Sequence, residues 1–82
     1  MPETLGDRIR AARLRYGMSQ AELARRVGVS TNAMNAMELN RVRNPGVLQV
    51  KAIAQVLGVS ADYLLGLREH EEEAASVAVG VA

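Results

Sequence analysis

With 82 residues, the chain is long enough for one domain and too short for two. It has no cysteine and one histidine, His70, which excludes a disulfide framework and leaves no set of thiolate or imidazole ligands for a metal site. The net charge of +1 is unevenly placed: residues 1–68 carry ten basic and five acidic side chains, whereas residues 69–82 carry four acidic ones. A basic body with an acidic tail favours a polyanionic partner.

The apolar residues are almost entirely aliphatic, because the chain has two tyrosines and neither tryptophan nor phenylalanine. Leucine, alanine, methionine and arginine are good helix formers, so an all-α fold with an aliphatic core is expected. No run of about 18 apolar residues and no signal-peptide pattern is present in the sequence. We therefore expect a soluble, cytoplasmic protein.

The first helix is predicted at about residues 4–16 and ends before Gly17, since glycine readily adopts the left-handed conformation that ends helices. Its apolar residues recur at helical spacing and define one face, which we expect to be buried. This face comprises Leu5, Ile9, Ala12 and Tyr16.

The second and third helices are predicted at residues 20–27 and 31–39. Each follows a serine, Ser19 or Ser30, whose hydroxyl can accept a hydrogen bond from a first-turn backbone N–H. Gly28 and Asn40 are the expected helix ends. The expected core residues are Leu23, Ala24 and Val27 in the second helix and Met34 and Met37 in the third.

The fourth helix is predicted at residues 47–57, and two starts are open: Asn44 as the cap with Pro45 in the first turn, or Gly46 as the cap. The fifth, at 61–65, follows Ser60 and ends before Gly66. Their expected core residues are Val47, Val50, Ile53, Ala54 and Leu57, and Tyr63, Leu64 and Leu65. Short connections between five helices predict a compact helical domain.

Catalysis is not expected from this sequence. Ser19, Ser30 and Ser60 fit helix caps better than nucleophiles, since no base and orienting group accompany them. The sequence also lacks an acid–base pair, a metal-ligand set and a phosphate-binding glycine loop. We therefore expect neither an enzyme nor a cofactor.

Glu38 lies one turn after Met34, which places a carboxylate at the edge of the core. A buried charge without a partner costs several kcal/mol, so a partner is expected. Arg13 lies one turn after Ile9, at the edge of the first helix's apolar face. We predict that Arg13 and Glu38 pair and hold the first helix against the third.

Two short helices joined by the Gly28 turn, in SQAELARRVGVSTNAMNAMELN, form a helix-turn-helix pattern whose second helix can lie in the DNA major groove. The chain resembles the Cro/CI-type, or XRE-like, helix-turn-helix family over residues 5–66. The matching segments are IRAARLRYGMSQAELARRVGVS, ME at 37–38, NRVRNPGV and IAQVLGVSADYLLG. The resemblance implies a lambda-repressor-like five-helix fold, operator binding and a homodimer.

The resemblance also implies roles for individual residues. Gln20 matches a glutamine that contacts the DNA backbone and steadies the recognition helix, and Arg41 and Arg43 match phosphate contacts. Arg13 and Glu38 match an interhelical ion pair. The positions that meet base edges correspond to Thr31, Asn32, Asn35 and Ala36.

Asparagine can pair with adenine N6 and N7, and the methyl groups of threonine and alanine can contact thymine. The outward face of the third helix lacks the Arg, Lys and Gln that are common there. We therefore expect A·T-leaning contacts assisted by DNA shape. A solvated helix face is the alternative interpretation of the two asparagines.

Residues 1–67 are expected to form the helix-turn-helix domain and residues 68–82 an acidic and apolar tail, either disordered or an arm that contributes to a dimer. Dimerisation is expected through the fifth helix, with the tail as a candidate addition. Three leucines fall outside the predicted core: Leu14, Leu39 and Leu48. They fit either ordinary surface exposure or a partner-binding surface.

The sequence thus predicts a DNA-binding transcriptional regulator, with repression of a pseudo-palindromic operator as the leading interpretation and double-stranded DNA as the partner. Such a protein would be of bacterial or phage type and would associate with the nucleoid when bound. The alternative is a helix-turn-helix module used mainly for protein–protein interaction, as in an antitoxin or a partner-binding regulator. Neither a membrane nor a small-molecule ligand is expected.

Overall fold

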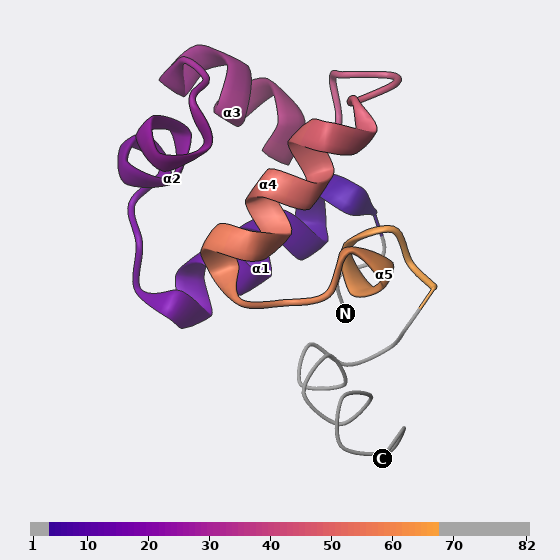
Figure 1. Cartoon of the computed structure of the whole chain (residues 1–82). Coiled ribbons are helices and arrows are strands. Elements are labelled where there is room, and N and C mark those ends of the chain that lie inside the picture. Colours follow the sequence, from indigo (N-terminus) through magenta and orange to yellow (C-terminus); the bar gives the residue numbers. More distant parts are fainter. Residues whose placement is uncertain (1–3, 68–82) are drawn as a thin grey trace.

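The computed structural model describes residues 4–67, and this part of the chain contains helices and no strand. The helices are α1 (Leu5–Tyr16), α2 (Gln20–Val27), α3 (Thr31–Glu38), α4 (Val47–Leu57) and α5 (Ala61–Leu64) (Figure 1). The predicted five-helix fold is confirmed. The predicted bounds of α2 and α4 agree with the structure, and those of the other three differ by one residue at one end. The predictions for residues 68–82 lie outside the described residues.

Side-chain caps begin four of the five helices. The hydroxyls of Thr4, Ser19, Ser30 and Ser60 each accept a hydrogen bond from the backbone N–H three residues later. Gly46 is the N-cap of α4 and makes no side-chain bond, so the second of the two predicted starts is correct. These serines are therefore engaged in holding helix ends.

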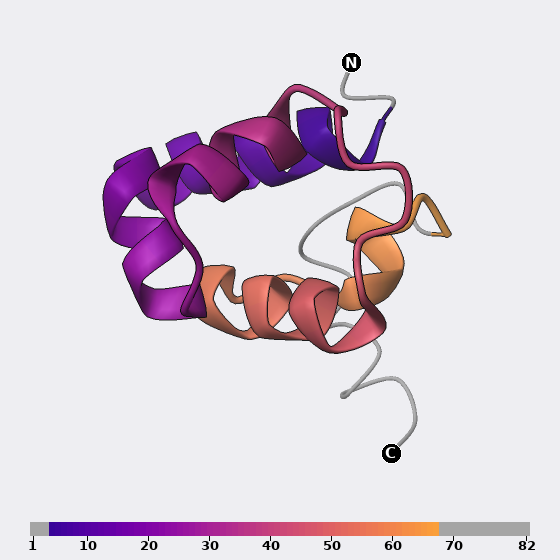
Figure 2. The same ribbon diagram turned by 90° about the horizontal axis from the view of Figure 1, so that it is seen from above.

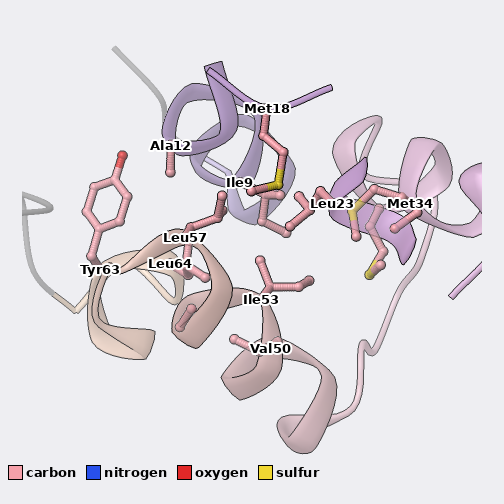
Figure 3. Packing of buried hydrophobic residues seen from close by; sticks show 13 residues of the cluster. Ile9, Ala12, Met18, Leu23, Met34, Val50, Ile53, Leu57, Tyr63 and Leu64 are labelled. Atoms are coloured by element: carbon pink, nitrogen blue, oxygen red, sulfur yellow. The ribbon is translucent and has the colours of Figure 1, made fainter. Parts of the chain in front are cut away.

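The helices enclose one core. α2 and α3 pack against each other, α1 contacts α3, α4 and α5, and α4 also contacts α2 and α5. Seen from above, α1 and α3 lie along one side of the molecule and α4 along the other (Figure 2). Each helix contributes one fully buried side chain to the space between them (Figure 3): Ile9, Leu23, Met34, Ile53 and Leu64.

Three residues that the periodicity assigned to the core are exposed. Tyr16, Val47 and Leu65 have exposed fractions of 54%, 82% and 53%. Tyr16 and Val47 are the last residue of α1 and the first of α4, and Leu65 follows the last residue of α5. Each therefore lies at or just beyond a helix end, where helical spacing alone does not ensure burial. Met18, which lies between α1 and α2, is buried in the core (Figure 3).

The N-terminal turn of α1 approaches the C-terminal end of α3 very closely at Gly6. A β-carbon on Gly6 would lie 2.5 Å from the carbonyl oxygen of Met37 and 2.6 Å from that of Glu38. In the same place, the Gly6 backbone N–H donates to Oδ1 of Asn40 over 2.9 Å. Asn40 is also the only non-glycine residue at positive φ among the described residues, with φ of 60°. It therefore ends α3 with its backbone and caps α1 with its side chain.

We expect Asn40→Gly to lower the free energy of unfolding by about 0.5–1.5 kcal/mol, because glycine keeps the left-handed backbone and loses the acceptor for Gly6 N–H. Asn40→Ala should cost roughly 1–2 kcal/mol more, since alanine is also strained at positive φ. Urea denaturation of the two variants measures both changes in the free energy of unfolding. An Asn40→Gly protein as stable as the parent would show that the side-chain cap contributes nothing.

Within residues 4–67, none of the helices has the length and apolar character needed to cross a bilayer.

Candidate nucleic-acid interface

The two sides of α3 carry different chemistry. Met34, Met37 and Glu38 are buried against the rest of the domain. Thr31, Asn32 and Asn35 are exposed, and Ala36 is half-buried at the edge of the same surface. The outward side of α3 therefore presents one hydroxyl and two amides to solvent. Of the four predicted base-contacting residues, Ala36 is the least accessible.

Arg13 and Glu38 form a buried pair between α1 and α3. Nε of Arg13 donates to Oε2 of Glu38 over 2.7 Å, and Nη2 donates to Oε1 over 3.0 Å. Nη1 of Arg13 donates to the carbonyl oxygen of Met18 over 2.9 Å. The exposed fractions of the two side chains are 10% and 2%. This bidentate arrangement fixes both charged groups in one orientation.

Gln20, the first residue of α2, links the buried pair to the outward face of α3. Its side-chain Nε2 donates to Oε1 of Glu38 and to Oδ1 of Asn35, each over 3.3 Å. These two hydrogen bonds were not predicted from the sequence. A signal for them is present, because Asn35 and Glu38 are three residues apart and are therefore neighbours on the surface of α3, so that one side chain can reach both.

The N-terminus of α2 is suited to an anion. The N–H groups of Gln20 and Ala21 have no acceptor within the helix, as in the first turn of any α-helix. The hydroxyl of Ser19 is already used to accept from the N–H of Glu22. Together with the positive end of the helix dipole, the two N–H groups can bind a phosphate oxygen.

The loop after α3 carries the two arginines predicted to contact phosphates. Arg41 and Arg43 are both exposed. The backbone N–H of Arg41 donates to the carbonyl oxygen of Ala36 over 2.9 Å, and that of Asn40 donates to Met37 over 3.1 Å. The start of the loop is thereby held against the end of α3. The guanidinium groups lie on flexible side chains beyond this anchored backbone.

A separate apolar groove of about 240 Å³ lies between α4 and α5. Its lining is almost wholly apolar and includes two residues wrongly assigned to the core, Val47 and Leu65; the other lining residues are Pro45, Val50, Lys51 and Ala61. Leu48 and Leu67 are also exposed, with exposed fractions of 80% and 73%. The exposure expected for Leu14, Leu39 and Leu48 is present in the structure.

A profile described as helix-turn-helix matches residues 9–64. The HTH-type transcriptional regulator SinR of Bacillus subtilis (strain 168) is 35% identical over 69 residues, which cover 84% of this chain and 61% of that protein. The chain thus spans about 61% of the length of this curated relative.

Two solved structures show the same arrangement of helices. The P22 c2 repressor in complex with a synthetic operator superimposes with a TM-score of 0.72 and 36% identity, covering 77% of this chain and 94% of that one. The SinR protein/SinI protein complex gives a TM-score of 0.72 and 34% identity, covering 76% and 60%.

Proposed function

The chain belongs to the Cro/CI-type helix-turn-helix family, and from this premise we propose that it is a sequence-specific DNA-binding transcriptional regulator that represses from a pseudo-palindromic operator. The observation that carries the proposal is the division of α3, with Met34, Met37 and Glu38 buried and three polar side chains outward. A helix held in this way can enter the major groove with its polar side toward the base edges. The repressor similar to this chain was solved on operator DNA.

In this proposal, Thr31, Asn32, Asn35 and Ala36 meet base edges. The N-terminus of α2 at Gln20 contacts one phosphate, while Arg41 and Arg43 contact others from the loop that follows α3. The arginines supply affinity that is independent of sequence and sensitive to salt, because each phosphate contact releases counterions. The base-facing residues discriminate between DNA sequences, and they contribute little to the salt dependence of binding.

We expect Asn32→Ala/Asn35→Ala to relax the motif selected from random duplexes and to leave the salt dependence of binding intact. Arg41→Ala/Arg43→Ala should do the opposite, reducing the slope of log K against log salt by about 1.8 with the motif retained. Selection at two salt concentrations measures both quantities, and Arg10→Ala, on the exposed side of α1, is the matched control for loss of a basic side chain. Salt-sensitive binding with no enriched motif would contradict sequence-specific regulation.

We further propose that the chain forms a homodimer through the α4–α5 groove. A two-fold dimer would place its two recognition helices about 34–36 Å apart, one turn of DNA. The groove supports this proposal because its lining is almost wholly apolar and includes exposed Val47 and Leu65 from its two sides. Exposed apolar surfaces of this kind mark association sites in soluble proteins.

Leu65→Glu is expected to raise the dimer dissociation constant by at least about tenfold, because each two-fold interface would bury two carboxylates in a largely apolar groove. The domain should stay folded, since Leu65 is 53% exposed. Sedimentation equilibrium measures the constant. Leu14→Glu, at 54% exposure on α1, is the matched control and should leave it unchanged. A monomeric parent at micromolar concentration would exclude this dimer.

The second candidate is a helix-turn-helix module that mainly binds another protein. The apolar groove favours it, as does the SinR protein/SinI protein complex among the similar structures. It predicts weak DNA binding without a motif, so the selection experiment separates the two functions. In either case we propose a regulator and not an enzyme; a DNA-bound regulator would act in the cytoplasm at the nucleoid.

A further inference from the structure

We propose that Gln20 is a positioning residue that fixes the side-chain amide of Asn35 with its N–H groups outward, so that Asn35 selects guanine over adenine. The inference rests on the proposed function, in which α3 lies in the major groove. It differs from the sequence-based expectation, which assigned Asn35 the usual asparagine–adenine pairing. The orientation follows from a chain of hydrogen bonds that begins in the core, at Arg13.

The first link is the carboxylate of Glu38. Arg13 holds both of its oxygens, with donor–acceptor distances of 2.7 and 3.0 Å, and the Glu38 side chain is 2% exposed. A carboxylate accepts hydrogen bonds and donates none. The group that faces Oε1 of Glu38 must therefore be a donor, and its identity is set by the buried pair.

The second link is the amide of Gln20. Nε2 of Gln20 lies 3.3 Å from Oε1 of Glu38 and 3.3 Å from Oδ1 of Asn35. The reverse orientation would place the Gln20 carbonyl oxygen against a carboxylate oxygen, and two acceptors repel. An amide nitrogen has two hydrogens, and both are used here. The side chain of Gln20 thus has no N–H left for a phosphate, which leaves its backbone N–H at the start of α2 for that contact.

The third link is Asn35. Its Oδ1 accepts from Gln20 and so points along the protein surface toward α2, with Nδ2 on the other branch of the amide. Pairing with adenine requires Oδ1 to accept from N6 while Nδ2 donates to N7. Guanine instead presents two adjacent acceptors, O6 and N7, and has no donor on that part of its edge. An asparagine with its N–H groups outward can therefore donate to both O6 and N7 of guanine, whereas adenine offers it N7 alone and places the N6 donor against its N–H groups.

The experiment compares DNA selected from random duplexes by the parent chain and by three variants. Asn35→Ala identifies the base position that Asn35 reads, as the position whose preference it loses. Gln20→Met keeps the length of the side chain and removes the amide, which releases Asn35 to turn over. Gln55→Met, on the exposed side of α4, is the matched control.

The parent and Gln55→Met should prefer guanine over adenine at the Asn35 position by between about 5- and 150-fold, the range for one well-formed base contact. Gln20→Met should lose most of that preference and keep the motif at other positions. A preference for adenine in the parent, or an unchanged preference for guanine in Gln20→Met, would overturn the proposal. Failure to enrich any motif would overturn the proposed function and the base preference together.

A measurement on the free protein tests the orientation without DNA. The side-chain NH2 protons of Gln20 should exchange with solvent several-fold more slowly than those of Gln55, and Asn35→Ala should reduce this protection. The NH2 protons of Asn35 should exchange rapidly. Rapid exchange at Gln20 would overturn the fixed orientation whatever the DNA selection shows. Slow exchange at Gln20 together with no enriched motif would contradict the proposed function and leave the amide orientation standing.

Discussion

Arg13→Ala is expected to lower the free energy of unfolding by about 3–5 kcal/mol, the cost of leaving a buried carboxylate without its partner. Glu38 would keep only the bond from Gln20, and the carbonyl oxygen of Met18 would lose its donor. A domain of this size has a total stability of roughly 4–12 kcal/mol, so much of it would be lost. The thermal midpoint should fall by at least about 12 °C, as measured by circular dichroism.

Two further variants separate the ion pair from simple loss of side-chain volume. Arg10→Ala removes an exposed arginine from the same helix and should change stability by no more than about 0.5 kcal/mol. Arg13→Met/Glu38→Met removes both charges and keeps apolar volume, so it should be more stable than Arg13→Ala even if that variant is unfolded. An unchanged thermal midpoint in Arg13→Ala would show that the pair does not hold α1 to α3.

Gly6→Ala is expected to destabilise the domain by about 1–3 kcal/mol, although alanine normally stabilises a helix interior relative to glycine. The added carbon would lie 2.5 and 2.6 Å from two carbonyl oxygens of α3 and 2.7 Å from Oδ1 of Asn40. Backbone atoms cannot rotate away as a side chain can. The end of α3 would have to separate from α1, which would also displace the loop that carries Arg41 and Arg43.

Urea denaturation measures the loss of stability, and amide chemical shifts of residues 37–43 report the displacement. Gly46→Ala is the matched control, because a β-carbon at Gly46 would meet nothing within 4 Å. Because Gly46 is the N-cap of α4, where alanine is less favourable than glycine, this variant should cost no more than about 1 kcal/mol and leave the shifts of residues 37–40 unchanged. A Gly6→Ala protein more stable than the parent would mean that α1 and α3 are not in close contact at this point.

Helix position was predictable because its determinants are local. A serine before a helix and a glycine or asparagine after it act within one turn, and Ser19, Gly28 and Ser30 place α2 and the start of α3 correctly. Periodicity also identified the buried side of α3. Since Glu38 lies on that side, the sequence could indicate that a carboxylate needed a partner, and Arg13 occupies that place in the structure.

Periodicity failed at the ends of helices for a physical reason. It gives the direction of a side chain about its own helix axis and contains no information on how far the neighbouring helix extends. Tyr16 and Val47 recur at the spacing of the buried residues of their helices and still lie in solvent. The same limitation hid the groove between α4 and α5, whose apolar lining includes Val47 and Leu65.

By itself, the sequence determined the five helices, the polar and buried sides of α3 and the positions of the candidate DNA contacts. Only the tertiary structure decided what lies across the gaps between helices: α3 against Gly6, and Gln20 between Glu38 and Asn35. Capping and periodicity depend on residues within a few positions of one another. The orientation of the Asn35 amide depends on Arg13, 22 positions earlier in the chain, acting through Glu38 and Gln20, and contact of that kind exists only after the helices have packed.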